Sequence, residues 1–339
     1  MGQENSVQYL QHYGFGRPPF RLSPDPECFF PSQTHQAAEK IITHAILSGE
    51  GFMVLSGQAG LGKTLLLRRI LHNTASRKLP ILILSPDVDS EGLLHLLLDA
   101  IGVKHPVDGN LAHLVQLFQE AMLDMAAGQS LELFIMVDEA QNMPLKTMEQ
   151  LRMLSNLETS QRKLMQIILV GQLELEILLA DPRLGQLAQR IVVHERLEPL
   201  NREEVSHYVS YRLHRAGRPD LRLSPAAEKL LTKASGGIPR LINRIMDRTL
   251  LLAAVEQPTR FEVSHVREAL ETINNLTWHS STRKRLLLGT ALLLVLVLIG
   301  AGVWAMFGDR PQSQFSLTAP AADGAIHSTL FTGRGAPPC

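Results

Sequence analysis

The sequence has few of the residues that define several protein classes. Its two cysteines, Cys28 and Cys339, stand far apart without the spacing of metal ligands, so neither a disulfide framework nor a zinc site is predicted. The 33 basic residues are balanced by 33 acidic ones, which excludes the global positive field of nonspecific nucleic-acid binders. The N-terminus has no basic stretch followed by an apolar core, so no cleavable signal peptide is expected.

Hydrophobic residues are abundant by comparison. They make up 45% of the 339 residues, which is enough for one large or two modest packed domains. Short apolar runs alternate with longer helical patterns, and this alternation predicts an α/β fold with a parallel five-stranded sheet between helices. The runs of strand length are 51–56, 79–84, 133–137, 166–170 and 191–194.

The stretch 57–64 has the spacing of a phosphate-binding P-loop, G-x-x-x-x-G-K-T, between a predicted strand and a predicted helix. Glycines let the backbone wrap around phosphates, so that N–H groups and the positive helix end point at them. Lys63 is predicted to neutralise the β- and γ-phosphates and the Thr64 hydroxyl to bind Mg²⁺. The residues expected to bind ATP are Gly57, Gln58, Ala59, Gly60, Leu61, Gly62, Lys63, Thr64 and Leu65.

A second motif follows the third predicted strand, which ends in Asp138-Glu139-Ala140-Gln141. An apolar strand that ends in two carboxylates delivers them to the carboxyl edge of the sheet, where such sheets bind ligands. Asp138 is predicted to hold Mg²⁺ through its water shell, and Glu139 to orient and polarise the attacking water. Together with the P-loop, this motif predicts a site that hydrolyses ATP.

Three further polar side chains are candidates for the same site. Gln172 follows the fourth strand and is expected near the γ-phosphate, with an ordinary turn residue as the alternative. A helix is predicted over 181–191, and Arg190 at its end is expected to project into the ATP of a neighbouring subunit. Arg183 is the alternative for that role, and a plain surface arginine is the third interpretation.

The pattern after residue 198 contains helices only, which predicts a separate small helical bundle. A Gly236-Gly237 pair ends one helix and Pro239 starts the next, so Arg240 is placed near a helix N-terminus. From there it is expected to reach the γ-phosphate and to make closure of the bundle depend on nucleotide. The predicted helices are 202–215, 224–234, 239–255 and 263–273. The first ATPase helix is predicted at 34–47, with Ser32 or Thr34 as its N-cap.

Residues 286–307 are 22 positions without a charge, which is long enough for a helix to span a hydrocarbon core of about 30 Å. The basic residues 283–285 precede this stretch. The positive-inside rule therefore places the preceding chain in the cytoplasm and the tail, 308–339, outside. The tail is rich in Pro, Gly, Ala, Ser and Thr and is expected to be flexible.

These motifs together resemble the general secretion pathway protein A (ExeA-like) AAA+ ATPases. The resemblance covers about residues 9–275. It is carried by Tyr13-Gly14-Phe15, Pro19-Phe20, Pro24-Asp25-Pro26, Phe29-Phe30, His35, the P-loop, Asp138-Glu139-Ala140-Gln141, the stretch 154–159, Val170-Gly171-Gln172 and the stretch 237–243. Members of this family usually carry a periplasmic peptidoglycan-binding domain after the membrane span, which the tail of this chain is too short to contain. Leu173 also replaces a proline that is usual there.

The resemblance implies an ATPase at the bacterial inner membrane. It would act by ATP-dependent assembly into a homo-oligomer and help secretion, pilus or polysaccharide-export complexes to pass the cell wall. It also implies Lys63, Thr64, Asp138 and Glu139 as Walker residues, Gln172 and Arg240 as sensors, and Arg190 as arginine finger. The missing domain moves the chain toward relatives associated with mannose-sensitive-type pili or exopolysaccharide export.

The predicted organisation has six segments. They are an N-terminal aromatic and proline-rich segment with the first helix (1–45), an AAA+ α/β domain (46–198), a helical lid (199–275), a basic juxtamembrane linker (276–285), the transmembrane helix (286–307) and an extracytoplasmic tail (308–339). Two other functions are open to the same sequence: a nucleotide-gated scaffold without hydrolysis, and a DNA-binding regulator related to transposition ATPases. Histidines such as His35 and His194 are interpreted as structural or solvated, because none has metal-ligand spacing.

Overall fold

The computed structural model describes residues 9–23, 28–74, 78–128, 132–158 and 163–274. The chain divides into two units, Met1–Thr277 and Trp278–Cys339. All described residues belong to the first unit. Within them, no helix is both long enough and apolar enough to cross a membrane. The predicted span 286–307 and the tail lie outside the described residues.

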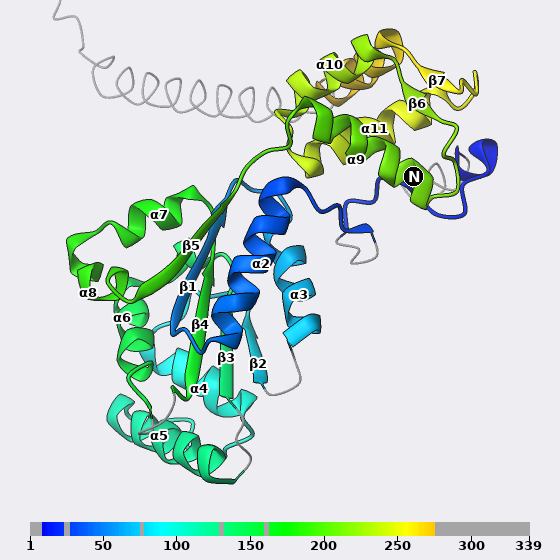
Figure 1. Ribbon diagram of the computed structural model, residues 1–339. Helices are drawn as coiled ribbons and strands as arrows, with labels where there is room; N and C mark the ends of the chain where they lie inside the picture. The colour runs from blue at the N-terminus through cyan, green and yellow to red at the C-terminus, as the bar shows by residue number, and fades with distance from the viewer. Residues whose placement is uncertain (1–8, 24–27, 75–77, 129–131, 159–162, 275–339) are drawn as a thin grey trace, which may run out of the picture. The chain divides into compact units, whose positions relative to one another are not determined.

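Five parallel strands form one sheet in the order β2-β3-β4-β1-β5 (Figure 1), which confirms the predicted fold class. Strand β4 lies between β1 and β3. The carboxyl end of β4 is therefore flanked by the ends of the P-loop strand and of the Asp-Glu strand. The strands are β1 (Phe52–Gly57), β2 (Lys78–Ile83), β3 (Glu132–Val137), β4 (Met165–Val170) and β5 (Ile191–Leu197).

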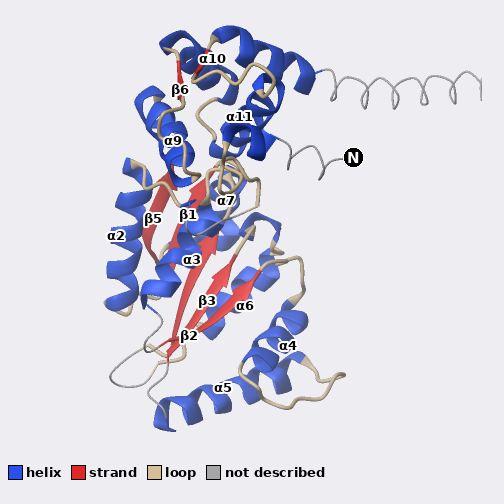
Figure 2. Cartoon of the chain, turned by 90° about the vertical axis from the view of Figure 1, so that its right-hand side faces the viewer, coloured by secondary structure: helices blue, strands red, loops and turns tan. Residues whose placement is uncertain are grey.

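Both faces of the sheet are covered by helices because its three central strands, β1, β3 and β4, are buried and mostly apolar on both sides. Along β1, Phe52 and Val54 pack in one hydrophobic cluster, whereas Met53 and Leu55 pack in another. Helices α2 and α3 supply the second cluster, and the helices from α4 to α8 supply the first (Figure 2). The helices are α2 (Gln33–Leu47), α3 (Lys63–Thr74), α4 (Ser90–Ala100), α5 (Leu111–Gly128), α6 (Leu145–Leu154), α7 (Leu173–Leu179) and α8 (Gly185–Ala188). Ser32 is the N-cap of α2.

The segment before β5 departs from the prediction. Instead of one helix over 181–191, the chain forms a 3₁₀ turn, η3 (Pro182–Leu184), and the short helix α8. The helix ends before Ile191 because that residue pairs with Phe52 of β1, so its backbone belongs to the sheet and cannot continue the helix. The fifth strand is also longer than predicted, because the polar residues after Val193 alternate between half-buried and exposed positions on an edge strand.

The lid is built on α9 (Arg202–Arg215), α10 (Pro225–Ser235), α11 (Pro239–Ala253) and helical residues 263–274. Asn201 and Glu204 form a capping box at the start of α9. The prediction of helices only was wrong, because two short strands, β6 (Arg222–Leu223) and β7 (Arg260–Phe261), pair in parallel. Each is only two residues long, so it leaves no periodic pattern in the sequence, but both bury an apolar residue in the lid core.

The aromatic N-terminal segment packs into the lid. Tyr9, Tyr13, Phe15 and Phe20 belong to the hydrophobic core of the lid, and the Tyr9 hydroxyl donates to Asp247 over 2.7 Å. Lid side chains also hold its backbone: Arg212 donates to the Pro19 carbonyl over 2.6 Å, and Asn243 to the Arg21 carbonyl over 3.1 Å. The chain then continues from the lid into α2, so this segment joins the two parts a second time, besides the connection from β5 to α9.

Candidate functional site

The loop between β1 and α3 has the backbone of a phosphate-binding loop. Gly57, Gly60 and Gly62 all have positive φ angles, of 149°, 86° and 98°, which side-chain-bearing residues rarely adopt. A Cβ on Gly57 would also lie 2.8 Å from the Leu197 carbonyl oxygen. These glycines therefore allow a turn that wraps tightly in front of the N-terminus of α3.

Lys63 lies at the start of α3 and is 6% exposed. Its ammonium donates hydrogen bonds to the carbonyls of Gly57, over 2.7 Å, and Gln58, over 3.0 Å. Burial lowers the pKa of Lys63, and the nearby carboxylates of Glu139 and Asp138 oppose that shift. The cation is thus held inside the loop, where a phosphate chain would bind.

Thr64 and Asp138 meet at the carboxyl edge of the sheet. The Thr64 hydroxyl donates to the Asp138 carboxylate over 2.6 Å, although the two residues are 74 positions apart. Asp138 is 6% exposed and directly follows β3. A hydroxyl and a carboxylate side by side are an oxygen ligand set that suits Mg²⁺, so these two residues fit the metal predicted for them.

Glu139 is held by two glutamine side chains. Its carboxylate accepts a hydrogen bond from Gln141 over 2.7 Å and one from Gln172 over 3.1 Å. Gln141 also accepts from the backbone N–H of Gln172 over 3.0 Å. Burial raises the pKa of Glu139, but the hydrogen bonds from Gln172 and Gln141 and the charge of Lys63 outweigh it, so the pKa lies below its usual value. The carboxylate is therefore ionised at neutral pH.

The Glu139 backbone is left-handed, with φ 49° and ψ 39°, a conformation that is rare for residues with a side chain. Such strain is kept only where the surrounding structure holds it, and it is common at functional sites. Gln141 supplies part of that support, a role that sequence reasoning missed. In the sequence, only the position of Gln141 two residues after Glu139 pointed to this role. Its partner Gln172 follows a different strand and is distant in the sequence.

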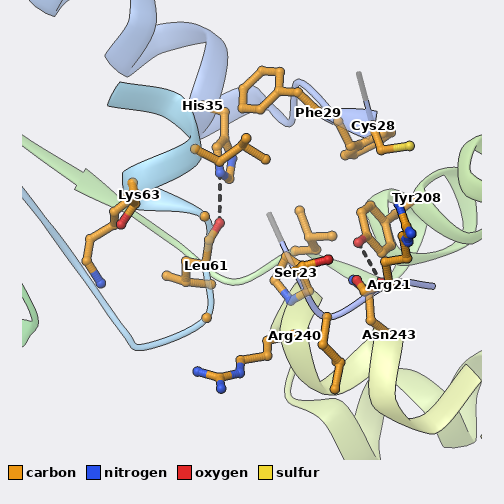
Figure 3. Close-up of a pocket in the computed structure, with 18 of the residues that line it drawn as sticks. Arg21, Ser23, Cys28, Phe29, His35, Leu61, Lys63, Tyr208, Arg240 and Asn243 are labelled. Carbon is orange, nitrogen blue, oxygen red and sulfur yellow. Dashed lines mark hydrogen bonds between the residues drawn. The ribbon is translucent and has the colours of Figure 1, made fainter. Parts of the chain in front are cut away.

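Arg240 comes from the lid. Its backbone N–H donates to the Gly60 carbonyl over 3.3 Å, and a Cβ on Gly60 would lie 2.7 Å from the Arg240 Cβ. The P-loop and the N-terminus of α11 therefore touch, and Gly60 is required for that close approach. Arg240 and Lys63 line the same cavity of about 370 Å³ (Figure 3). Its other walls come from the N-terminal segment, including Phe29, and from lid residues, including Tyr208.

Arg190 lies at the other end of the sheet from the P-loop of its own chain. It precedes the amino end of β5, where Ile191 pairs with Phe52, and its guanidinium donates to the Ser155 hydroxyl over 3.2 Å. Strand β1 separates this end from the P-loop by about 17 Å, at roughly 3.3 Å per residue. Arg190 therefore cannot reach its own phosphate site. Arg183 lies in η3, on the surface, and pairs with Asp181 over 2.6 Å.

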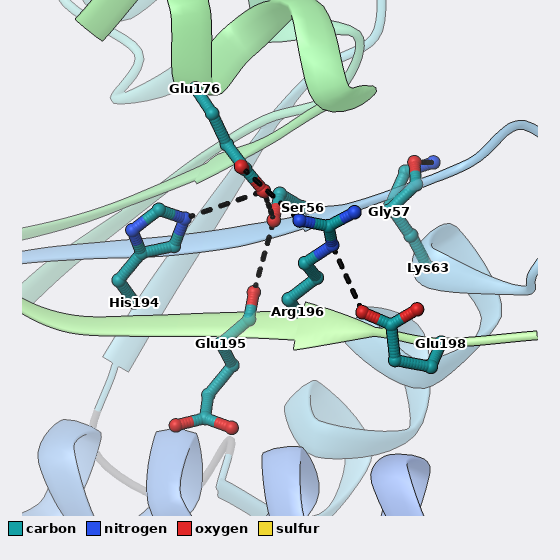
Figure 4. A network of polar contacts seen from close by, with 8 residues as sticks. All are labelled: Ser56, Gly57, Lys63, Glu176, His194, Glu195, Arg196 and Glu198. Atoms are coloured by element: carbon teal, nitrogen blue, oxygen red, sulfur yellow. Dashed lines mark hydrogen bonds and ion pairs between the residues drawn. The ribbon is translucent and has the colours of Figure 1, made fainter. Parts of the chain in front are cut away.

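A polar network ties α7 to the strands beside the P-loop (Figure 4). Glu176 accepts a hydrogen bond from the Ser56 hydroxyl over 2.5 Å and lies 3.7 Å from the guanidinium of Arg196 on β5. His194 approaches the same carboxylate at 3.8 Å. These contacts hold α7 against both β1 and β5, and Gln172 is the residue that immediately precedes this helix.

The sequence and the fold both have relatives. Residues 45–179 match the family described as AAA domain. General secretion pathway protein A of Aeromonas hydrophila is 35% identical over 305 residues, which is 90% of this chain and 55% of that protein. The chain thus spans about half the length of that relative.

Two solved structures are similar in fold. One is the Aeropyrum pernix ORC2 protein in ADPNP and ADP complexes, with a TM-score of 0.57, 17% identity, and 76% of this chain and 72% of that chain covered. The other is the Aeropyrum pernix ORC1 protein in complex with DNA, with a TM-score of 0.55, 18% identity, and 76% and 69% covered. At these identities the likeness shows the fold alone.

Proposed function

The chain is an AAA-type ATPase related to General secretion pathway protein A, and from this premise we propose that it hydrolyses ATP with Mg²⁺ to assist the assembly of a bacterial envelope machine. The observation that carries the proposal is that residues following three strands of the sheet contact one another at its carboxyl edge. The Thr64 hydroxyl contacts Asp138, and Gln172 contacts Glu139, so the loop after β1 and the ends of β3 and β4 form one constellation.

The residues have separable roles in that reaction. Lys63 and the loop N–H groups would bind the phosphate chain, with Lys63 exchanging its two carbonyl partners for phosphate oxygens. Thr64 and Asp138 would hold Mg²⁺, which offsets the charge on the phosphates when it is bound. The ionised Glu139 would orient the attacking water and accept its hydrogen bond, while Gln172 keeps that carboxylate in place.

The contact between the lid and the P-loop would depend on which nucleotide is bound. Arg240 lies in the first turn of α11, beside Gly60, so its guanidinium is available to the γ-phosphate from the lid side of the cavity. Loss of the γ-phosphate would remove that partner and loosen the contact between lid and loop. Nucleotide-dependent closure would in turn regulate assembly into a homo-oligomer, to which Arg190 of a neighbouring subunit contributes as arginine finger.

The test of the ATPase proposal is phosphate release by the purified full-length chain. Release is expected with ATP and Mg²⁺, and is expected to stop when the metal is removed by EDTA and to return when Mg²⁺ is restored in excess. Size measurements with and without ATP follow oligomerisation in the same samples. Nucleotide-dependent size without any phosphate release would instead support the nucleotide-gated scaffold. Salt-dependent DNA affinity would support the DNA-binding regulator.

The machine that we propose is a secretion, pilus or polysaccharide-export complex at the inner membrane. Support comes from the 35% identity to General secretion pathway protein A over most of this chain. The ATPase part would be cytoplasmic and anchored by residues 286–307, with residues 308–339 on the periplasmic side, because the stretch 286–307 is uncharged and follows a basic cluster.

Truncation tests the anchor. A chain that ends at residue 285 is expected to leave the membrane fraction and keep its nucleotide binding, because the P-loop and the lid are intact. A chain that ends at residue 310 is the matched control and should stay with the membrane after an alkaline carbonate wash. The anchor is refuted if the full-length chain is itself released by that wash, or if both truncated chains remain bound.

A further inference from the structure

A buried histidine in the first turn of α2, His35, contacts the phosphate-binding loop. His35 is 3% exposed and packs with the Phe29 ring in a T-shaped arrangement, with ring centroids 5.6 Å apart. Its Nε2 is 2.9 Å from the carbonyl oxygen of Leu61 (Figure 3). Its Nδ1 is 2.6 Å from the hydroxyl of Ser32. Both ring nitrogens therefore have a partner, and one partner is the backbone of the P-loop.

These partners determine where the ring proton is. A carbonyl oxygen can only accept, so Nε2 carries the hydrogen and donates it to Leu61. In the neutral ring Nδ1 is then a bare acceptor, and the Ser32 hydroxyl donates to it. Burial lowers the pKa of His35, against smaller opposing effects of the Leu61 hydrogen bond and of Glu204 and Glu39, which favours this neutral form. The Leu61 carbonyl thus selects the tautomer, and the Ser32 hydroxyl, which can donate or accept, satisfies the remaining ring nitrogen.

The bond to Leu61 also orients the next N–H of the loop. The peptide between Leu61 and Gly62 is trans, and in a planar trans peptide the C=O and the following N–H point in opposite directions. With the Leu61 carbonyl held toward His35, the Gly62 N–H must point away from it. The ring lies close above this peptide, since a Cβ on Gly62 would be 3.6 Å from Nε2.

We propose that His35 is a positioning residue that presets the phosphate-binding loop. By holding the Leu61 carbonyl on the α2 side, it keeps the Gly62 N–H oriented toward the phosphates before nucleotide binds. The loop then loses less conformational freedom on binding, which strengthens affinity for the phosphate chain. This inference rests on the proposed ATP-binding function and adds to it a residue that acts through the Leu61 carbonyl of the loop, while its side chain also lines the cavity shared by Lys63 and Arg240.

The same turn of α2 also contacts the lid. The backbone N–H of Gln33 donates to the Glu204 carboxylate over 3.0 Å, and the same carboxylate accepts from the backbone N–H of Asn201, the N-cap of α9. The first turn of α2 therefore touches the loop through His35 and the lid through Gln33. His35 is therefore placed to hold the position of the loop relative to the lid. The lid contacts the adjoining part of the loop, because the Arg240 N–H donates to the Gly60 carbonyl.

The experiment compares side chains that differ in the donor at this position. His35→Leu removes it, His35→Gln places an amide N–H about as far out as Nε2, and His35→Asn ends one carbon earlier. His44→Leu, at an exposed position on the same helix, is the control. Affinities of the full-length variants for ADP and for adenosine are measured by displacement of a fluorescent ADP analogue, alongside kcat and KM for ATP and thermal unfolding.

We expect His35→Leu and His35→Asn to weaken ADP binding about tenfold and to raise KM for ATP in proportion, with kcat changed by less than a factor of about three. Adenosine affinity should be unchanged, and His35→Gln should recover most of the ADP affinity. Equal weakening of ADP and adenosine, or no recovery with glutamine, would overturn the inference and leave His35 a packing residue. If His35→Leu does not fold, the pair of glutamine and asparagine variants decides the same question. Failure of the unaltered chain to bind ADP would instead count against the proposed function.

Discussion

Replacing Glu139 with glutamine is expected to slow ATP hydrolysis by about 10²–10⁴-fold, while ATP affinity changes by no more than a factor of a few. The amide keeps the size of the side chain but cannot accept the proton or polarise the water as a carboxylate does. The Glu139 carboxylate is ionised at neutral pH because the hydrogen bonds from Gln172 and Gln141, together with Lys63, outweigh its burial. ATP affinity is retained because the loop, Lys63 and Thr64 are unchanged.

The measurement pairs phosphate release under saturating ATP with direct ATP binding by the same preparation. Glu120→Gln is the matched control, since that glutamate is exposed on α5, far along the chain from the P-loop. Hydrolysis at the normal rate by the Glu139→Gln variant would show that another group activates the water. A loss of ATP binding would show instead that Glu139 supports the structure of the site.

Replacing Arg190 with alanine is expected to lower ATP turnover by about 10³-fold or more in the assembled protein and to leave ATP binding unchanged. An arginine that reaches the γ-phosphate from a neighbouring subunit offsets charge that develops in the transition state. Because Arg190 lies at the amino end of β5, about 17 Å from its own P-loop, it can act only on another subunit. Arg183→Ala is the matched control from the same region, and its loss is expected to have little effect.

Mixed oligomers separate action on a neighbour from action within one chain. An Arg190→Ala subunit has an intact P-loop, and a Lys63→Ala subunit has an intact Arg190. Mixing the two should restore part of the turnover that each lacks alone. If Arg183→Ala is the variant that loses turnover, then Arg183 is the finger. If neither arginine matters, or if mixing restores nothing, the composite site between subunits is wrong.

Much of the fold could be predicted because its signals are local. Apolar runs of strand length and helical periodicity are set by neighbours in the sequence, so the first four strands, α2 and the lid helices were predicted close to their observed bounds. The prediction of one helix over 181–191 was wrong because Ile191 pairs with β1, and its backbone is therefore part of the sheet. The strands β6 and β7 were missed because two residues are too few to make a pattern.

The site divides in the same way. The P-loop and the Asp-Glu pair are local motifs with their own spacing, so their residues could be named from the sequence. Gln141 and His35 could not be given roles, because each acts through a partner that is distant in the chain: Gln172 for the one and the Leu61 carbonyl for the other. Hydrogen-bonding partners of this kind are determined by the packing of strands and helices, and no pattern of residue spacing in the sequence indicates them.

The sequence by itself determined the chemistry of this protein: a glycine-rich loop with Lys63 and Thr64, and a strand that ends in two carboxylates. These follow from covalent neighbours, which the order of residues specifies. Only the tertiary structure decided which groups meet, because contact between Thr64 and Asp138, 74 positions apart, depends on the order of strands in the sheet. The tertiary structure also brought the N-terminal aromatic segment into the lid, and put Arg190 out of reach of its own P-loop.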